Sequence, residues 1–244
     1  MRDVEEIGPE PPALERRAVM SQRWTDLAYY HWRYDPAVVQ SCLPEGVRVD
    51  TFDGSAWVAV VPFVMRDVRL GPTPPLPWLG TFVEINVRSY VVDAAGRRRV
   101  WFWSLDVPRT VVVGVARTVF SLPYCWAATR HTTSTTSEGV RHRYEMTRRW
   151  PRRGATADMS FTIGDPIDEP DELDHFLTAR WGLVAERFGR ARSGRVHHPR
   201  WPLHAILDGT IDETIVAAAG LPAPVGAPHL RCSPGVPVEV AWFD

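Results

Sequence analysis

The stretch Phe82–Val92, FVEINVRSYVV, separates into a polar and an apolar face at the two-residue period of a β-strand. The polar face carries Glu84, Asn86, Arg88 and Tyr90, and the apolar face carries Val83, Ile85, Val87, Ser89 and Val91. Strongly apolar segments lie on both sides, at 78–82 and 100–107, which indicates a central strand. We therefore predict that its polar row lines an internal pocket of a barrel or curved sheet. The alternative is a solvated face with a weak Glu84–Arg88 surface pair.

Further strand-like segments follow one another at a spacing of about ten residues. We expect strands at 47–52, 55–65, 100–106, 126–132, 140–147, 155–164, 182–188, 195–203 and 236–243, with an Asp53-Gly54 hairpin turn joining the first two. Short helices are expected at 36–43, 171–181 and 212–220, the first with Asp35 as its N-cap. Residues 108–120 fit a strand or a helix. The pattern predicts an α+β, mostly antiparallel β domain with a few short helices.

The N-terminal segment, the net charge, the apolar runs and the cysteines together limit the domain organisation, the partners and the compartment of the protein. Residues 1–20 are charged and proline-bearing, and we expect a flexible N-terminal tail before a single domain at 21–244, with Met20 as an alternative start. The formal net charge of −1 gives no electrostatic reason to expect nucleic acid. No apolar run reaches the length of a membrane helix. The three cysteines, Cys42, Cys125 and Cys232, have no framework spacing, which favours a cytoplasmic protein; a homo-oligomer stays open.

The 28 basic residues are all arginines, so the chain contains no lysine. It therefore has no side-chain amine to form a Schiff base and no phosphate-loop lysine. No dinucleotide-binding, phosphate-loop, zinc-protease or serine-hydrolase motif occurs in a supporting context. His197, His198 and His204 come nearest to a metal cluster, but no carboxylate or cysteine lies at a useful spacing. We expect neither a metal nor a cofactor.

Several motifs in matching order resemble the YqjF-like family of uncharacterised bacterial proteins, also called domain of unknown function 2071. The matching segments are RWTDLAYYHW, LPEGVRVDTFDGSAWVAVVPFVM, FVEINVRSYVV, FWSLDV, ARTVFSLPYCWA, HHPRWPLH and SPGVPVEVAWF. The resemblance extends from about Met20 to the C-terminus. Members of that family resemble acetoacetate decarboxylase in fold, which implies a barrel-like sheet around an internal pocket.

The wider resemblance to acetoacetate decarboxylases implies roles for particular residues. Those enzymes have a Gly-Arg-Glu followed by Gly-Phe-Pro-Lys-Lys, whose first lysine forms the Schiff base. In the similar segment ARTVFSLPYC, Arg117 matches the arginine, and Tyr124 and Cys125 stand in place of the two lysines. Glu84 resembles the glutamate of the pocket strand. The resemblance also favours a helix over residues 108–120, and it implies a pocket that has lost its nucleophile.

Three functions remain open. The first is a non-covalent enzyme that isomerises, dehydrates or cyclises a small carbonyl or polyketide-like compound, with Glu84 as base and Tyr124 as acid, while Arg117 or Arg88 clamps a carboxylate or enolate. The second is a non-catalytic binding protein for a small apolar or carboxylate ligand. The third is a structural role, in which Glu84 forms a buried ion pair with an arginine. Asn86, Tyr90, His31 and Cys125 complete the candidate substrate-binding set, although a histidine in an aromatic run is more often a core residue.

Overall fold

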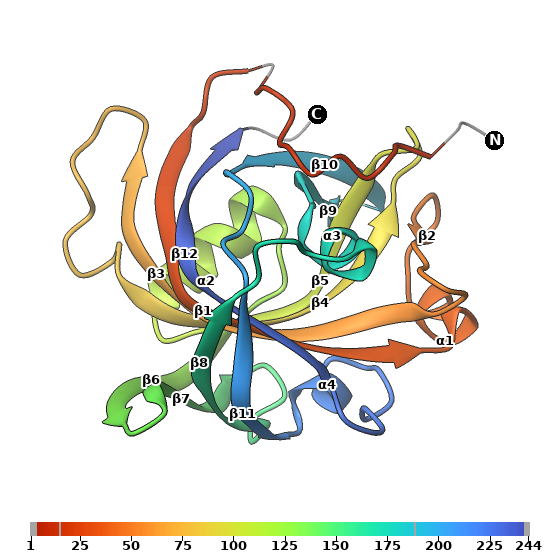
Figure 1. The fold of residues 1–244 in the computed structure, drawn as a ribbon. Helices are drawn as coiled ribbons and strands as arrows, with labels where there is room; N and C mark the ends of the chain where they lie inside the picture. The colour runs from red at the N-terminus through yellow and green to blue at the C-terminus, as the bar shows by residue number, and fades with distance from the viewer. Residues whose placement is uncertain (1–3, 15, 188, 242–244) are drawn as a thin grey trace.

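The computed structural model describes residues 4–14, 16–187 and 189–241, whose strands form one 12-stranded sheet (Figure 1). The strands are β1 (Met20–Tyr34), β2 (Arg48–Val49), β3 (Ala56–Leu70), β4 (Phe82–Val92), β5 (Arg98–Val107), β6 (Tyr124–Thr136), β7 (Gly139–Trp150), β8 (Thr156–Pro166), β9 (Gly182–Arg187), β10 (Arg190–His197), β11 (His204–Glu213) and β12 (His229–Ala241). The helices are α1 (Pro36–Ser41), α2 (Thr110–Val115), the π-helix η1 (Ala116–Phe120), α3 (Glu172–Thr178) and α4 (Ile215–Ala218). The α+β, mostly antiparallel fold class is confirmed.

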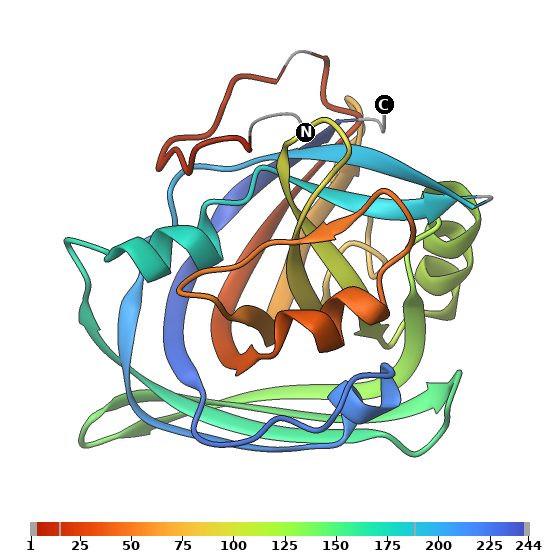
Figure 2. The same cartoon turned by 90° about the vertical axis from the view of Figure 1, so that its right-hand side faces the viewer.

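The sheet curves into a ring because its strand pairings close on themselves. Strands β12, β1, β3, β4 and β5 pair in succession, and β9 and β10 then lead back from β5 to β12. A second series of pairings leads from β5 through β6, β7, β8 and β11 to β12. Strands β6, β7, β8 and β11 curve beneath the strands of the first series (Figure 2). Pairing is antiparallel except where β5 meets β6 and β9. Within the described residues, no helix is long and apolar enough to cross a membrane.

Strand β4 is buried on both faces. Ile85 and Val87 pack into a hydrophobic core with Tyr144 of β7 and Phe161 of β8, as expected for the apolar face. The polar face is also hidden from solvent, since Glu84, Asn86, Arg88 and Tyr90 are all at most 9% exposed. A solvated polar face is therefore wrong, and both faces of β4 point to the interior of the protein.

Many of the expected elements occur where the pattern placed them. Strand β4 has the predicted bounds, and β5, β6 and β7 include the strands expected at 100–106, 126–132 and 140–147. Strand β5 pairs antiparallel with β4, and β6 and β7 form a hairpin. Asp35 caps α1 and Asp171 caps α3, so both helix starts are confirmed. The ambiguous segment 108–120 is helical, as the family resemblance favoured.

Two expectations along the chain are wrong. The strand expected at 195–203 ends at His197, because Pro199 and Pro202 have no N–H to continue a ladder. Residues 204–213 form a strand that the sequence reading missed, and the helix expected at 212–220 is reduced to α4. Two register shifts against β8, before Ile206 and before Gly209, interrupt the alternation that would have revealed β11.

The turn expected at Asp53-Gly54 is present, but the two strands expected to pair on either side of it do not pair with each other. Strand β2 has only two residues and pairs with the end of β4, Arg48 opposite Val92. Strand β3 pairs with β1 and β4 instead, and a single bridge between Phe52 and Ser55 closes the turn.

The described part of the N-terminal segment contains no helix or strand before β1, but it contacts the domain. The amide of Glu5 donates to the carbonyl of Gly96, and the Glu5 carboxylate accepts from the amide of Arg98. Ile7 packs beside a hydrophobic cluster that includes Phe176. The loose attachment expected for residues 1–20 stays a prediction, and residues 1–3 and 15 lie outside the described part.

Candidate functional site

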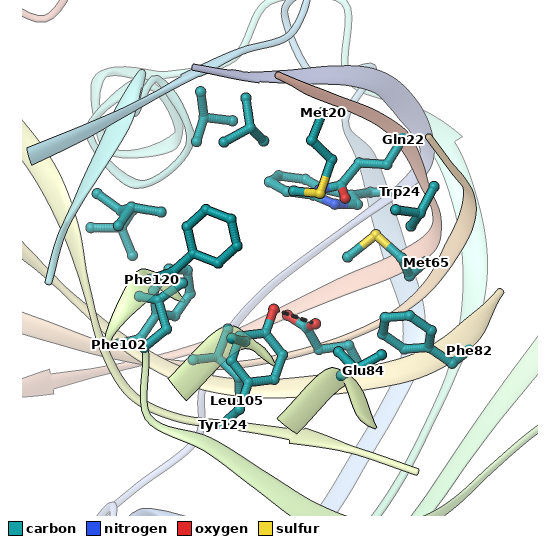
Figure 3. Close-up of a pocket in the computed structure, with 18 of the residues that line it drawn as sticks. Met20, Gln22, Trp24, Met65, Phe82, Glu84, Phe102, Leu105, Phe120 and Tyr124 are labelled. Carbon is teal, nitrogen blue, oxygen red and sulfur yellow. Dashed lines mark hydrogen bonds between the residues drawn. The ribbon is translucent and has the colours of Figure 1, made fainter. Parts of the chain in front are cut away.

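A cavity of about 350 Å³ lies inside the ring that β9 and β10 help to close. Strands β1, β3, β4 and β5 and the α2–η1 segment all contribute to its walls (Figure 3). The walls are mostly hydrophobic, with large side chains that include Met20, Met65, Phe82, Phe102, Leu105 and Phe120. Such a lining with a few polar groups is typical of a small-molecule site.

Glu84 and Tyr124 meet in the wall of this cavity. Strand β5 lies between their strands: Leu105 is opposite Asn86 of β4 on one side and Tyr124, the first residue of β6, on the other. The Tyr124 hydroxyl donates a hydrogen bond to Oε2 of Glu84, with the oxygens 3.1 Å apart (Figure 3). The pairing of three strands thus brings together two residues that are 40 positions apart.

Burial controls the protonation of this pair. Removal of Glu84 from water raises the pKa of its carboxyl to about 8, although hydrogen bonds from Tyr124 and Asn86 act in the opposite direction. The pKa of Tyr124 lies well above its usual value, first because of burial and then because of the neighbouring Glu84. Glu84 is therefore mostly neutral at pH 7 and can accept or release a proton close to neutrality.

Of the other polar residues expected on β4, Arg88 also lines the cavity. Its Nη2 donates to the Tyr90 hydroxyl at 3.2 Å, and that hydroxyl lies 2.6 Å from Nε2 of His31. Tyr90, His31 and Asn86 are buried and are not among the residues that line the cavity. Burial, reinforced by the charge of Arg88, holds the pKa of His31 well below its usual value, so its imidazole is neutral. Tyr90 thus contacts both Arg88 and His31.

The structure does not bring Arg117 or Cys125 to the cavity. Arg117 is exposed on η1, where its guanidinium lies over the Trp150 ring and donates to the backbone carbonyl of Tyr124 at 2.8 Å. Cys125 follows Tyr124 in β6, so its side chain points to the opposite face of the strand. Its buried thiol lies 3.6 Å from the Pro123 carbonyl, and burial raises its pKa to about 11, which keeps the sulfur protonated.

Trp24, Arg180 and His198 line the cavity but were not among the candidate site residues. Arg180 follows α3 and His198 follows β10, so their positions depend on how distant elements pack. Nδ1 of His198 donates to the Pro199 carbonyl at 2.8 Å, and burial lowers the pKa of the ring to about 4. The described residues contain no cluster of three ligands that could hold a metal ion. Arg180 is one of 28 arginines, and nothing in the surrounding sequence distinguishes it from the others.

Solved structures with this arrangement of strands define the class of fold. The enduracididine biosynthesis enzyme MppR, complexed with pyruvate, is 14% identical with a TM-score of 0.66, covering 95% of this chain and 92% of MppR. An acetoacetate decarboxylase-like enzyme from Sphingomonas wittichii RW1 is 15% identical with a TM-score of 0.64, covering 93% and 92%. The acetoacetate decarboxylase of Legionella pneumophila is 10% identical with a TM-score of 0.59, covering 95% and 92%. The chain therefore has an acetoacetate decarboxylase-like fold.

The sequence assigns the chain to one family of proteins, which is a narrower statement than the class of fold. The model of domain of unknown function 2071, a family of uncharacterized conserved proteins, matches residues 21–237, and the chain belongs to this family. The uncharacterized protein YqjF of Bacillus subtilis (strain 168) is 29% identical over 214 residues, which cover 87% of this chain and 86% of YqjF. The resemblance inferred from the motifs is confirmed.

Proposed function

We propose that this protein is a lysine-free enzyme that moves a proton on a small carbonyl compound inside the cavity, in an isomerisation, dehydration or cyclisation. The observation that carries the proposal is the buried Glu84–Tyr124 pair, in which a carboxyl with a pKa of about 8 contacts a phenol. A carboxyl that titrates near neutral pH suits general acid–base catalysis. The fold is shared with MppR, which has been solved with pyruvate and with a pyruvate condensation product.

In the proposed step, ionised Glu84 removes a proton from the carbon beside the substrate carbonyl. The electrons of the C–H bond form a C=C bond, and the carbonyl π electrons move to oxygen. The Tyr124 hydroxyl turns from Glu84 to donate to that oxygen, which stabilises the developing charge. Protonated Glu84 then returns the proton to the same or another carbon, so no external reactant is consumed.

Imine chemistry has no place in this proposal because the chain has no lysine. Acetoacetate is therefore not expected to lose CO₂ above background. Borohydride is not expected to attach any carbonyl compound to the folded protein. Covalent trapping would contradict the proposed non-covalent step.

The second candidate function is a non-catalytic carrier. The mostly hydrophobic wall favours it, since such a cavity can hold an apolar or carboxylate ligand without reacting with it. In this case Tyr124 would serve only as a hydrogen-bond donor. In either function, free Cys42, Cys125 and Cys232 suit a reducing compartment such as the cytoplasm.

Proton exchange in D₂O separates the enzyme from the carrier. We would follow the loss of ¹H NMR signals beside the carbonyl for acetoacetate, pyruvate and a series of longer oxo acids, and measure binding of each compound by calorimetry. The enzyme should accelerate exchange for at least one of them. Tyr124→Phe should lower that rate by a factor corresponding to about 2–4 kcal/mol.

The carrier predicts another outcome for the same variant. It binds a compound without accelerating exchange, and Tyr124→Phe weakens binding by only about 0.5–1.5 kcal/mol. If Tyr124→Phe matches the wild type in both exchange and binding, Tyr124 is a packing residue and the proposed site is wrong.

A further inference from the structure

Arg88 is a buried cation in the wall of the cavity. Its side chain is only 9% exposed, and its guanidinium lies 5.1 Å from the ring centre of Tyr29 and 5.5 Å from that of Tyr90. Its Nη2 donates to the Tyr90 hydroxyl, but its Nε has no hydrogen-bond acceptor among the described residues. No aspartate or glutamate of the described chain forms an ion pair with it. A buried charge in this condition is costly unless a ligand supplies the counter-charge.

Arg180 adds a second unsatisfied donor to the same cavity wall. Its Nε donates to the Phe176 carbonyl and its Nη1 to the Asp50 carboxylate at 2.7 Å, whereas its buried Nη2 has no acceptor in the described part of the chain. Asp50 also pairs with Arg98, so a single carboxylate serves two guanidinium groups. The guanidinium of Arg180 lies 4.9 Å from the Tyr90 ring, which Arg88 also contacts from 5.5 Å. One region thus carries an excess of positive charge.

The other ionisable groups that face this region do not neutralise it. His198 is neutral because burial lowers its pKa to about 4, and His31, behind Tyr90, is neutral for the same reason. Glu84 is also mostly uncharged at pH 7. Within the described cavity wall, the positive charge of Arg88 is therefore left for a ligand to balance.

The positive region is separated from the proton-transfer pair. Glu84 and Arg88 are four positions apart on one face of β4, which puts their Cα atoms about 13 Å apart. The Arg88 guanidinium is turned toward Tyr90, the residue two positions further from Glu84. The wall of the cavity as a whole is mostly apolar, and Asn86 lies between the two residues on this face of β4.

We propose that Arg88 and Arg180 form a carboxylate-binding subsite for an oxo acid in which an apolar spacer of several carbon atoms separates the carboxylate from the reacting carbonyl. The proposal rests on the proposed function for the carbonyl end and on the two unsatisfied guanidinium groups for the carboxylate end. A guanidinium matches the planar, bidentate geometry of a carboxylate. A 2-oxo acid is too short to contact both groups at once.

The test compares probes of one chain length on the wild-type protein. The probes are 7-oxooctanoate, 2-oxooctanoate, methyl 7-oxooctanoate, octanoate and 2-octanone, each measured for its dissociation constant and for hydrogen exchange in D₂O. We expect 7-oxooctanoate to bind at least tenfold more tightly than its methyl ester or 2-octanone, and to exchange faster than 2-oxooctanoate. Equal affinity of the acid and its ester would overturn the subsite, and equal exchange of the two oxo acids would overturn the spacing.

Variants then assign the effect to the two arginines. Arg88→Gln and Arg180→Gln should each weaken octanoate binding at least tenfold and leave 2-octanone binding unchanged. Arg143→Gln, a change of an exposed arginine on β7, is the control and should affect neither. Because the probe comparison uses only wild-type protein, a variant that fails to fold does not decide the test. Arg-dependent octanoate binding with no exchange of any oxo acid would support the subsite and contradict the proposed enzyme.

Discussion

Arg148 of β7 and Asp106 of β5 form a buried, two-pronged ion pair. Nε and Nη2 of Arg148 donate to Oδ1 and Oδ2 of Asp106, both at 2.7 Å, and Nη2 also donates to Ser104. The two side chains are 2% and 0% exposed. Because β6 lies between these strands and starts at Tyr124, the pair connects its two neighbours behind the proposed site.

Breaking this ion pair should strongly destabilise the protein. Arg148→Met leaves Asp106 buried and unpaired, and we expect a loss of about 3–5 kcal/mol in the free energy of unfolding. The measurement is urea unfolding followed by tryptophan fluorescence. The double variant Arg148→Met/Asp106→Leu should lose less than Arg148→Met alone, because it removes the stranded charge. A single variant within 1 kcal/mol of the wild type would show that the pair has no structural role.

The raised pKa of Glu84 predicts how stability depends on pH. The folded-state pKa of about 8 exceeds the ordinary value of 4.5, so the folded protein binds the proton more tightly than the unfolded chain. This contribution to stability is fully present below about pH 4.5 and is lost as pH rises through 8. Glu84→Gln, which cannot ionise, should therefore gain stability relative to the wild type as pH increases.

Melting temperatures of the two proteins at several pH values measure this effect. The difference should change by up to about 3–5 °C per pH unit between pH 5 and 8. Glu145→Gln, which alters an exposed carboxylate on β7, is the control for a simple loss of charge. If the melting temperatures of the wild type and Glu84→Gln change in parallel over this pH range, the pKa of Glu84 is close to its ordinary value.

Local pattern predicted the part of the site that lies on one strand. The two-residue period of β4 identified Glu84 and Arg88, and both line the cavity. Arg180 and His198 could not be found in this way, because each lies just beyond a helix or strand and reaches the cavity only through tertiary packing. Arg117 was expected at the cavity from its position in the similar motif, yet its side chain lies over Trp150. A motif aligns the backbone, whereas rotamer and helix geometry decide where the side chain points.

The fold was predictable where patterns were long and regular. Strand β4 pairs with β3 without a register shift, and the β6–β7 hairpin is paired continuously from Ala127 to its turn, so the positions of these strands were predictable. Strand β11 was not found because its register shifts break the alternation of inward and outward residues. Among the described residues, three residue pairs between β10 and β12 close the ring, and this pairing has no local signal in the sequence.

Deletion of residues 1–18 should lower the melting temperature by no more than a few degrees. The Glu5 carboxylate lies 3.5 Å from Arg99 and that of Glu10 lies 3.7 Å from Arg200, but both acids are well exposed, so each pair is weak. Arg99 keeps its hydrogen bond to Ser193 after the deletion. The deletion ends before Met20, which lines the cavity. Differential scanning calorimetry gives the measurement, and a loss above about 8 °C would show that the segment belongs to the core.

Gly235 is predicted to be a position where even one added carbon disrupts the cavity. It lies on β12 with a φ of +119°, and a Cβ there would come within 1.9 Å of the Trp24 carbonyl oxygen. Gly235→Ala must therefore push β12 away from β1, and we expect a loss of more than about 2 kcal/mol in the free energy of unfolding, above the ordinary cost of a left-handed alanine. Since the Trp24 side chain lines the cavity, ligand binding should weaken as well.

Gly226→Ala is the matched control, with a φ of +81° and no atom within 4 Å of the added carbon. Equal losses in the two variants, measured by urea unfolding, would mean that backbone conformation alone accounts for the glycine and that the close approach to Trp24 adds nothing.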